Sequence, residues 1–265
     1  MPAVRIRSIR VTRYVTPLRE GGSLPAIVEA DDDGMYVLKF RGAGQGPKAL
    51  IAELVCGEIG RALGLPVPEI VFAELDHDLS RTEPDHEISA LIRRSAGLNL
   101  ALDYLPGSVT YDPLVMRLES DLISRIVWFD AYVSNVDRTA RNPNMLIWHR
   151  KLWLIDHGAA LYFHHSTGWE TDAAKPGDGF TLIKQHVLLH RATSLRAIDE
   201  DIARALPAET LNRIVDLIPA VWLVDDDTPE QPAPSLAARR TGYLRYLTER
   251  LAAPRAFIDE ALRVR

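Results

Sequence analysis

The chain of 265 residues contains a single cysteine, Cys56, which excludes an internal disulfide framework and a zinc site built from several cysteines. No apolar run approaches the roughly eighteen residues of a membrane-spanning helix, and the first residues lack the apolar segment of a secretory signal. A formal net charge of −5 argues against a general nucleic-acid-binding surface. We therefore expect a cytoplasmic protein that contacts neither nucleic acid nor membrane directly.

Strand patterns occupy the first part of the chain and helix patterns the second. Segments that alternate or cluster as β-strands do lie at residues 4–15, 26–30, 35–40, 69–75 and 99–105. A helix is expected among them at 47–63, with a proline in its first turn and a glycine after its end. Residues 88–93 fit either a helix or a strand. Further helices are predicted at residues 114–133, 180–189, 194–206, 209–223, 236–252 and 255–264.

This order predicts an α+β protein with two lobes. With 47% hydrophobic residues, the chain can bury a sizeable core. Residues 1–105 are expected to form a β-rich N-lobe, an antiparallel sheet with one helix. Residues 106–265 are expected to form a mainly helical C-lobe that carries the functional loops.

The most informative stretch is residues 127–158. It runs from an apolar helix into a polar loop with Asp137 and Asn142, then through a predicted β-hairpin at 145–155 that ends on Asp156-His157-Gly158. In phosphoryl transfer, one carboxylate orients the attacking hydroxyl, while an amide and a second carboxylate hold Mg²⁺ on the nucleotide phosphates. Protein kinases keep the same five-residue offset between aspartate and asparagine and have Asp-Phe-Gly in place of Asp-His-Gly.

Each piece of this stretch also has a structural explanation. Aspartate and asparagine are common in loops because their side chains cap their own backbone, and Asp-His-Gly forms turns readily. The pieces occur here in the order of a nucleotide site, with a hairpin between the two acids. That combination favours phosphoryl transfer.

Lys39 lies in an otherwise apolar strand. This indicates either an edge lysine that extends to water or a buried lysine with an acidic partner. The predicted helix at 47–63 carries two candidates for that partner. Glu58 falls within its apolar stripe and Glu53 lies on the opposite side, so periodicity indicates Glu58.

Two further segments are expected to contact a nucleotide. Gly22 and Ser23 lie at a glycine-containing tip whose amides can approach phosphates closely, although a plain hairpin tip explains them as well. Asp103, Tyr104 and Leu105 end the last predicted strand before a Pro-Gly pair and form the expected hinge between the lobes.

With these residues in place, the sequence resembles the HipA-like kinases, bacterial relatives of the phosphatidylinositol and protein kinases. The matching segments are residues 36–40, 49–68, 129–144 and 154–158. The resemblance implies a two-lobed kinase fold with ATP and Mg²⁺ as cofactors. It also implies transfer of the γ-phosphoryl group to a serine or threonine of a protein that the sequence does not identify.

The resemblance assigns a role to each motif residue. Asp137 is the catalytic acid or base, Lys39 contacts the nucleotide phosphates, and Asn142 and Asp156 bind the metal. Asp137, Lys39 and Asn142 together form the expected catalytic group.

Two assignments remain open. Asn142 keeps the family's five-residue offset from the catalytic aspartate, whereas Asn144 keeps the family's position directly before the next strand. We expect Asn142 as the metal ligand, with Asn144 as the alternative. For the helix glutamate, the resemblance implies Glu53, against the Glu58 that periodicity indicates.

Two other functions are compatible with the layout. Small-molecule kinases of the aminoglycoside type carry a His-Gly-Asp stretch before the catalytic loop, where this chain has Ser134-Asn135-Val136-Asp137. A nucleotide-binding pseudokinase would act by protein association, although the charged groups needed for transfer are present. The acceptor surface is expected to depend on loops such as residues 164–179.

Overall fold

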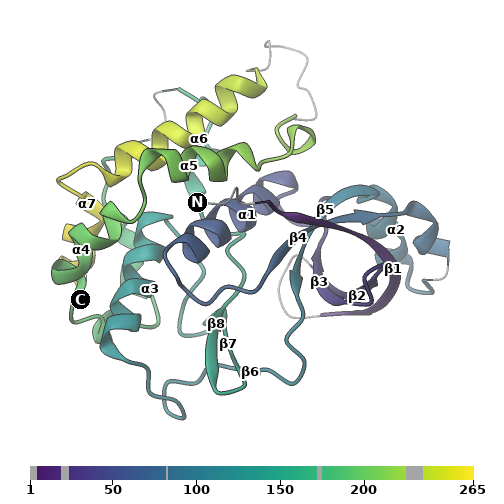
Figure 1. Cartoon of the computed structure of the whole chain (residues 1–265), viewed down its shortest axis with the longest axis horizontal. Coiled ribbons are helices and arrows are strands. Elements are labelled where there is room, and N and C mark those ends of the chain that lie inside the picture. The colour runs from purple at the N-terminus through teal and green to yellow at the C-terminus, as the bar shows by residue number, and fades with distance from the viewer. Residues whose placement is uncertain (1–4, 19–23, 82, 172–174, 225–234) are drawn as a thin grey trace.

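The first strands of the chain close into a barrel, at the right of Figure 1. The computed structural model, which describes residues 5–18, 24–81, 83–171, 175–224 and 235–265, gives the strand order β1-β2-β3-β5-β4. The strands are β1 Arg7–Pro17, β2 Ala26–Ala30, β3 Met35–Lys39, β4 Ile70–Leu75 and β5 Gly97–Asp103. β1 and β4 pair in parallel, and the other neighbours are antiparallel.

The barrel interior is an apolar core of its own. Its buried members include Val28, Leu38, Val71, Ala101 and three residues of helix α2 (His86–Arg94), namely Ile88, Leu91 and Ile92. The side chain of Asp85 starts α2 by accepting the N–H groups of Glu87 and Ile88. The ambiguous segment at 88–93 is therefore helical.

Two details of the predicted N-lobe are wrong. The sheet is not wholly antiparallel, because β1 and β4 run in parallel. Residues 1–105 also contain α2 in addition to the expected helix. Strand patterns show where strands lie but not which strands become neighbours, and a parallel pair needs a crossover that joins distant segments.

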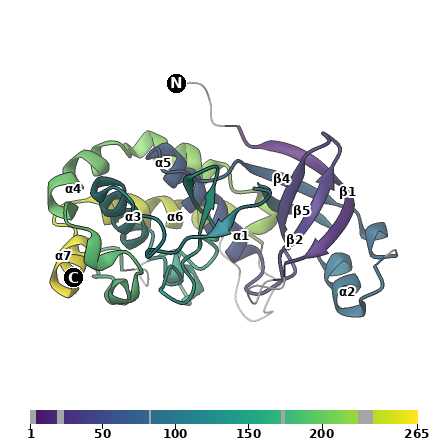
Figure 2. The same ribbon diagram turned by 90° about the horizontal axis from the view of Figure 1, so that it is seen from below.

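Helix α1 (Pro47–Ala62) lies between the barrel and the C-terminal helices (Figures 1 and 2). It contacts β4 and β5 on one side and α5 (Ala208–Asp216) on the other. The buried residues of α1 belong to the same apolar core as the C-terminal helices. The helix is therefore a shared element, and a division of the chain at residue 105 stays a prediction.

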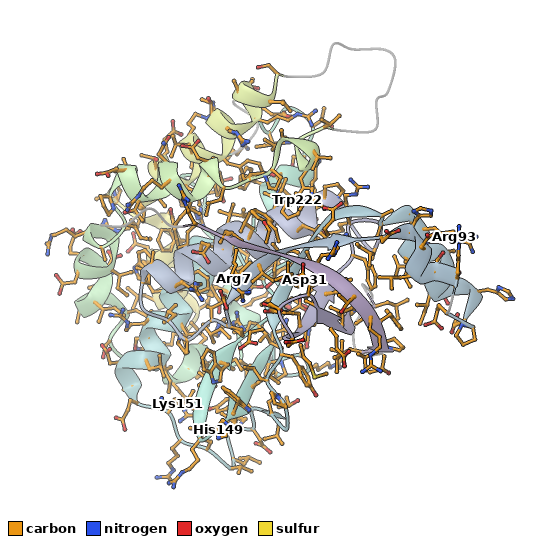
Figure 3. The ribbon with its side chains drawn as sticks, turned by 45° about the vertical axis from the view of Figure 1, so that its right-hand side comes forward. Arg7, Asp31, Arg93, His149, Lys151 and Trp222 are labelled. Carbon is orange, nitrogen blue, oxygen red and sulfur yellow. The ribbon has the colours of Figure 1, made fainter. Side chains whose placement is uncertain are left out.

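Trp222, in the short helix η5 (Ala220–Trp222), also joins the two halves. Its Nε1 donates to the Leu98 carbonyl at 3.1 Å, and its ring meets the Phe72 ring edge-on, with centroids 5.7 Å apart. Figure 3 shows Trp222 between the C-terminal helices and the barrel. The indole thus connects the helical half to strands β4 and β5.

The second half is mainly helical, and its described residues include a small sheet in the order β6-β7-β8. Its helices are α3 Ser120–Tyr132, α4 Leu195–Arg204, α5, α6 Leu236–Leu251 and α7 Ala256–Val264. The sheet consists of β6 Val109–Thr110, β7 Met145–Trp148 and β8 Lys151–Leu154, and it confirms the predicted hairpin. The short 3₁₀ helices of this half include η2 Tyr162–His165, η3 Thr181–Gln185 and η4 Leu189–Arg191, and another, η1 His77–Arg81, lies in the first half.

Helix α3 is shorter than predicted and begins at Ser120. The Asp112 side chain accepts the N–H of Leu114 at 2.8 Å and closes a turn there, and Leu114 and Val115 face solvent. The helix predicted at 180–189 is replaced by η3 and η4. No helix in the described ranges is long and apolar enough to cross a membrane.

Candidate active site

Lys39 ends strand β3 with its ammonium between two carboxylates. Nζ lies 2.6 Å from Asp156 Oδ1 and 3.5 Å from Glu53 Oε2. The side chains of Lys39 and Glu53 are 12% and 1% exposed, against 38% for Asp156. These residues come from the barrel, helix α1 and the segment after β8, so one cation joins three separate elements.

The glutamate of α1 that reaches Lys39 is Glu53, as the family resemblance implies. Glu58 pairs instead with Arg61, at 3.1 Å. Periodicity indicates the wrong residue because every residue of α1 from Leu50 to Gly60 is buried. A helix enclosed on all sides has no solvent face to contrast with an apolar stripe.

Burial and charge act in opposite directions on this pair. Burial disfavours the Lys39 ammonium, but Glu53 and Asp156 raise the pKa of Lys39 well above its usual value. Burial likewise disfavours the Glu53 carboxylate, but Lys39 and His157 lower the pKa of Glu53 to about 2. Both groups are therefore charged at neutral pH, and each supplies the countercharge that the other requires.

A buried carboxylate, Asp130 of α3, organises the loop that follows this helix. Its Oδ1 accepts from Asn135 Nδ2 at 2.8 Å, and its Oδ2 accepts from Arg138 Nε at 2.6 Å and His186 Nε2 at 2.9 Å. His186 Nδ1 accepts the backbone N–H of Leu188, so the ring proton is on Nε2. Burial disfavours the charged form, but Arg138 and His186 hold the pKa of Asp130 far below its usual range.

The same contacts place Asp137 and join its loop to the β7–β8 hairpin. The Asn135 side chain accepts the backbone N–H of Asp137 at 3.1 Å. Arg138 Nη1 donates to the carbonyls of Asn144 and Ile155, which lie just before β7 and just after β8. The loop that carries Asp137 is therefore fixed to the base of the hairpin that ends at Asp156.

Both candidate asparagines contact Asp137. Asn142 Nδ2 and Asn144 Nδ2 donate to its Oδ2 at 2.8 Å and 3.2 Å. A carboxylate only accepts hydrogen bonds, so each amide must turn its nitrogen towards Asp137 and its oxygen away. Within the described part of the chain, no side chain or backbone group donates to these amide oxygens or to Asp137 Oδ1.

Asn144 lies close to Asp156 as well. Its carbonyl accepts the N–H of Ile155 at 3.0 Å, so the two residues close the base of the hairpin. Asn144 and Asp156 both have left-handed backbone, with φ of 47° and 57°, a conformation that Asn and Asp adopt more easily than most residues. This geometry makes Asn144 as strong a candidate metal ligand as Asn142.

The expected hinge follows β5 and leaves the barrel. The backbone N–H groups of Asp103 and Tyr104 already donate to carbonyls of barrel residues, at 2.9 Å and 3.1 Å. The N–H of Leu105 has no backbone acceptor among the residues described. Gly22 and Ser23 lie outside those residues.

The sequence pattern of the HipA-like kinases matches residues 11–249. The chain belongs to the HipA-like kinase family. Among solved structures, the Helicobacter pylori proinflammatory kinase CtkA resembles this fold with a TM-score of 0.58 at 12% identity, over 97% of this chain and 99% of CtkA. The Golgi casein kinase gives a TM-score of 0.48 at 11% identity, over 98% of this chain and 73% of that protein. No curated protein matches the chain.

The family match confirms the resemblance drawn from the motifs, and the likeness to CtkA confirms a kinase-like fold of strands and helices. As a member of this family, the HipA-like kinase described here is a phosphotransferase. The roles of its individual residues stay predictions.

His157 occupies the position of phenylalanine in the Asp-Phe-Gly of protein kinases. It is fully buried, with Nδ1 3.3 Å from Glu53 Oε1 and its ring edge-on to Phe129 at 5.6 Å. Its Nε2 has no partner in the described part of the chain. Because ionised Glu53 only accepts hydrogen bonds, the ring proton belongs on Nδ1, and His157 holds one oxygen of Glu53 while Lys39 approaches the other.

Sequence reasoning did not single out Asp130, His157 or His186. Asp130 had a visible signal, because it is an acid within an apolar helical run and a buried acid requires partners. His186 had none, since its contact with Asp130 spans 56 residues.

In this HipA-like kinase, Asp130→Asn should lower the free energy of unfolding by about 3 kcal/mol at pH 7, because Arg138 then remains buried without its countercharge. The folded pKa of Asp130 lies far below the usual aspartate pKa of about 3.9, so its stabilisation is fully present above that pH and is lost as the pH falls towards the folded pKa. Chemical denaturation between pH 7 and pH 3 should show that the difference in unfolding free energy between wild type and Asp130→Asn becomes smaller only near pH 3. Asp201→Asn, at an exposed Arg204 pair, is the control. A deficit equal to that of the control would contradict the proposed anchoring role.

His157→Asn and His157→Phe separate hydrogen bonding from packing. Asparagine places an N–H at the position of Nδ1, whereas phenylalanine keeps the ring contact with Phe129 and loses the donor. Loss of a hydrogen bond to a charged group can change turnover about tenfold. We therefore expect His157→Phe to have an about tenfold lower kcat and His157→Asn to retain most activity. The opposite order, measured by steady-state kinetics, would show that packing alone matters.

Proposed function

We propose that this HipA-like kinase transfers the γ-phosphoryl group of MgATP to a serine or threonine hydroxyl of a protein. The observation that carries the proposal is the Lys39 ammonium, which contacts both Glu53 and Asp156 across three elements of the fold. A lysine in this setting supplies a fixed positive charge for nucleotide phosphates. A lysine that only extended to water would have no need of two carboxylates.

The nucleotide would bind between the barrel and the helical half. The N–H of Leu105, which has no backbone acceptor among the described residues, suits a hydrogen bond to an adenine base at the hinge. Lys39 suits the phosphates, because its ammonium is held at the junction by Glu53. On nucleotide binding, the Lys39 ammonium would move from Asp156 to the phosphates, which leaves Asp156 free for a metal ion.

The residues near Asp156 fit a magnesium ion. Mg²⁺ prefers oxygen ligands and commonly takes one or two carboxylates beside substrate phosphates. Asp156 supplies a carboxylate, and Asn142 and Asn144 turn amide oxygens away from Asp137. When bound, the ion would neutralise charge on the phosphates.

Asp137 is suited to position the acceptor. Its Oδ2 is held by two amides, and its Oδ1 receives no hydrogen bond from the described residues, so an incoming hydroxyl can donate to that oxygen. As the bond from the hydroxyl oxygen to the γ-phosphorus forms, the bond from that phosphorus to the β–γ bridging oxygen breaks and ADP leaves. The hydroxyl proton passes to Asp137.

Asp137→Asn should lower kcat by about 100- to 10,000-fold, because the carboxylate acts on the acceptor during transfer. Affinity for ATP should change by less than about threefold, since Asp137 is not a nucleotide ligand in this proposal. Phosphoryl transfer and nucleotide binding by calorimetry test this, with Asp201→Asn as the exposed control. An equal loss of affinity and turnover would argue for a binding role. A wild-type protein that binds ATP without turnover would be a pseudokinase.

Asp156→Ala should remove the ability of Mg²⁺ to strengthen ATP binding, because the carboxylate is the proposed main metal ligand. Calorimetric titrations with ATP, in Mg²⁺ and in chelator, measure that difference directly. The same titrations on Asn142→Ala and Asn144→Ala would identify which amide belongs to the metal site. If Asp156→Ala still binds MgATP more tightly than metal-free ATP, the metal ligand lies elsewhere.

A further inference from the structure

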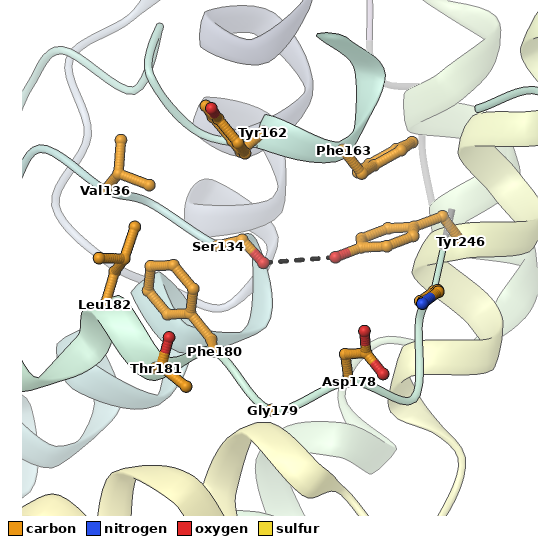
Figure 4. Close-up of a pocket in the computed structure, with 11 residues that line it drawn as sticks. Ser134, Val136, Tyr162, Phe163, Asp178, Gly179, Phe180, Thr181, Leu182 and Tyr246 are labelled. Atoms are coloured by element: carbon orange, nitrogen blue, oxygen red, sulfur yellow. Dashed lines mark hydrogen bonds between the residues drawn. The ribbon is translucent and has the colours of Figure 1, made fainter. Parts of the chain in front are cut away.

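A cavity of about 280 Å³ opens beside the loop that carries Asp137 (Figure 4). It is lined by Ser134, Val136, Tyr162, Phe163, Lys175, Asp178, Gly179, Phe180, Thr181, Leu182 and Tyr246. Val136 directly precedes Asp137 in the chain. Because consecutive Cα atoms are about 3.8 Å apart, the cavity lies next to the residue proposed to receive the acceptor hydroxyl.

Aromatic rings form much of the cavity wall. Phe163 stacks on Tyr246 with ring centroids 3.7 Å apart, and the Tyr246 hydroxyl lies 3.3 Å from Ser134 Oγ, the dashed contact in Figure 4. Tyr162 and Leu182 are 58% and 41% exposed although they line the cavity. Tyr162 and Leu182 therefore present apolar surface at the cavity, beside the polar side chains of Lys175, Asp178 and Thr181.

A buried arginine fixes the cavity relative to the loop. Arg250 of α6 donates to the carbonyls of Pro176 and Asp178, both at 2.9 Å, on the cavity side. It also donates to the carbonyls of Ala131 and Tyr132, at 3.0 Å and 2.8 Å, at the end of α3. The same arginine thus holds the cavity wall and the helix from which the Asp137 loop starts.

The volume and the lining residues of the cavity indicate what kind of group it can bind. Its volume of about 280 Å³ is large enough for one large side chain. Lys175 and Asp178 bring charges of opposite sign to its edge, which favours neither sign in a ligand. The aromatic and aliphatic lining favours a large apolar side chain.

We propose that this cavity binds a large apolar side chain of the protein acceptor, close in sequence to the serine or threonine that is phosphorylated. An extended peptide advances about 3.3 Å per residue, so the bound side chain belongs about one to three residues from the acceptor hydroxyl. The proposal rests on the proposed function, because it assigns a docking site to a protein substrate. The acceptor is the expected ligand of the cavity because the lining residue Val136 directly precedes Asp137.

A positional-scanning library of serine- and threonine-centred peptides, phosphorylated with MgATP, tests this. The wild-type kinase should prefer Leu, Met or Phe over Ala at one position near the acceptor, by about tenfold or more in kcat/KM. Leu182→Glu places a charge in the cavity mouth and should reduce that preference to near unity, through a higher KM for the apolar peptide. Leu236→Glu is the matched control, because Leu236 is 40% exposed, does not line the cavity and should leave the preference unchanged.

The preference is a ratio measured within each variant, so it does not depend on how much active enzyme a variant yields. Tyr162→Ser, from another segment of the lining, should lower the same ratio. The docking site would be overturned if the wild-type kinase showed no preference between apolar and alanine peptides. It would also be overturned if Leu182→Glu and Leu236→Glu showed the same preference, or if MgATP were turned over without phosphorylation of any peptide. A wild-type protein that does not turn over MgATP at all would overturn the proposed function itself.

Discussion

The structure around the site depends on the burial of the Asp130 carboxylate. A charge removed from water is stable only when donors surround it, and the donors to Asp130 come from the loop after α3 and from the segment that follows η3. The requirement to satisfy this carboxylate therefore fixes the path of the loop that carries Asp137. Arg138 extends the constraint to the carbonyls of Asn144 and Ile155, at the base of the hairpin that leads to Asp156. One buried charge thus positions both acids of the motif.

A second buried network, formed by Lys39, Glu53 and His157, joins the barrel and α1 to the same hairpin. Neither Lys39 nor Glu53 is stable in this interior without the other, since burial alone would neutralise each of them. The two networks meet at adjacent residues, because Arg138 contacts Ile155 and Lys39 contacts Asp156. The relative placement of barrel and helices at the site is therefore set by directional contacts as well as by the shared apolar core.

The sequence predicts those parts of the site whose chemistry requires a fixed residue type at a fixed spacing. In the proposed function, Lys39, Asp137, Asn142 and Asp156 are of this kind, and the structure brings Lys39 to Asp156 and Asn142 to Asp137. Strand positions follow from alternation, whereas the parallel β1–β4 pair does not, because alternation carries no information about neighbours. The choice between Glu53 and Glu58 is decided by which side of an enclosed helix faces Lys39, and only three-dimensional packing determines that. The cavity near Asp137 combines segments from residue 134 to residue 246, so no local pattern predicts it.

Two kinds of surface lie near Asp137: the charged hydrogen-bond networks and the aromatic lining of the cavity. They suit different physical requirements. Phosphoryl transfer needs atoms held within fractions of an ångström, and charged hydrogen bonds supply that precision because they depend strongly on distance and angle. Recognition of an acceptor side chain needs burial more than direction, and in the proposed docking site the aromatic lining would supply it because the hydrophobic effect scales with area. Among the described lining residues, Ser134 and Val136 belong to the loop that Asp130 anchors, whereas Leu182 and Tyr162 do not contact that carboxylate. If the cavity binds the acceptor as proposed, changes at Tyr162 or Leu182 would alter acceptor preference while the charge networks keep Asp137, Lys39 and Asp156 in place.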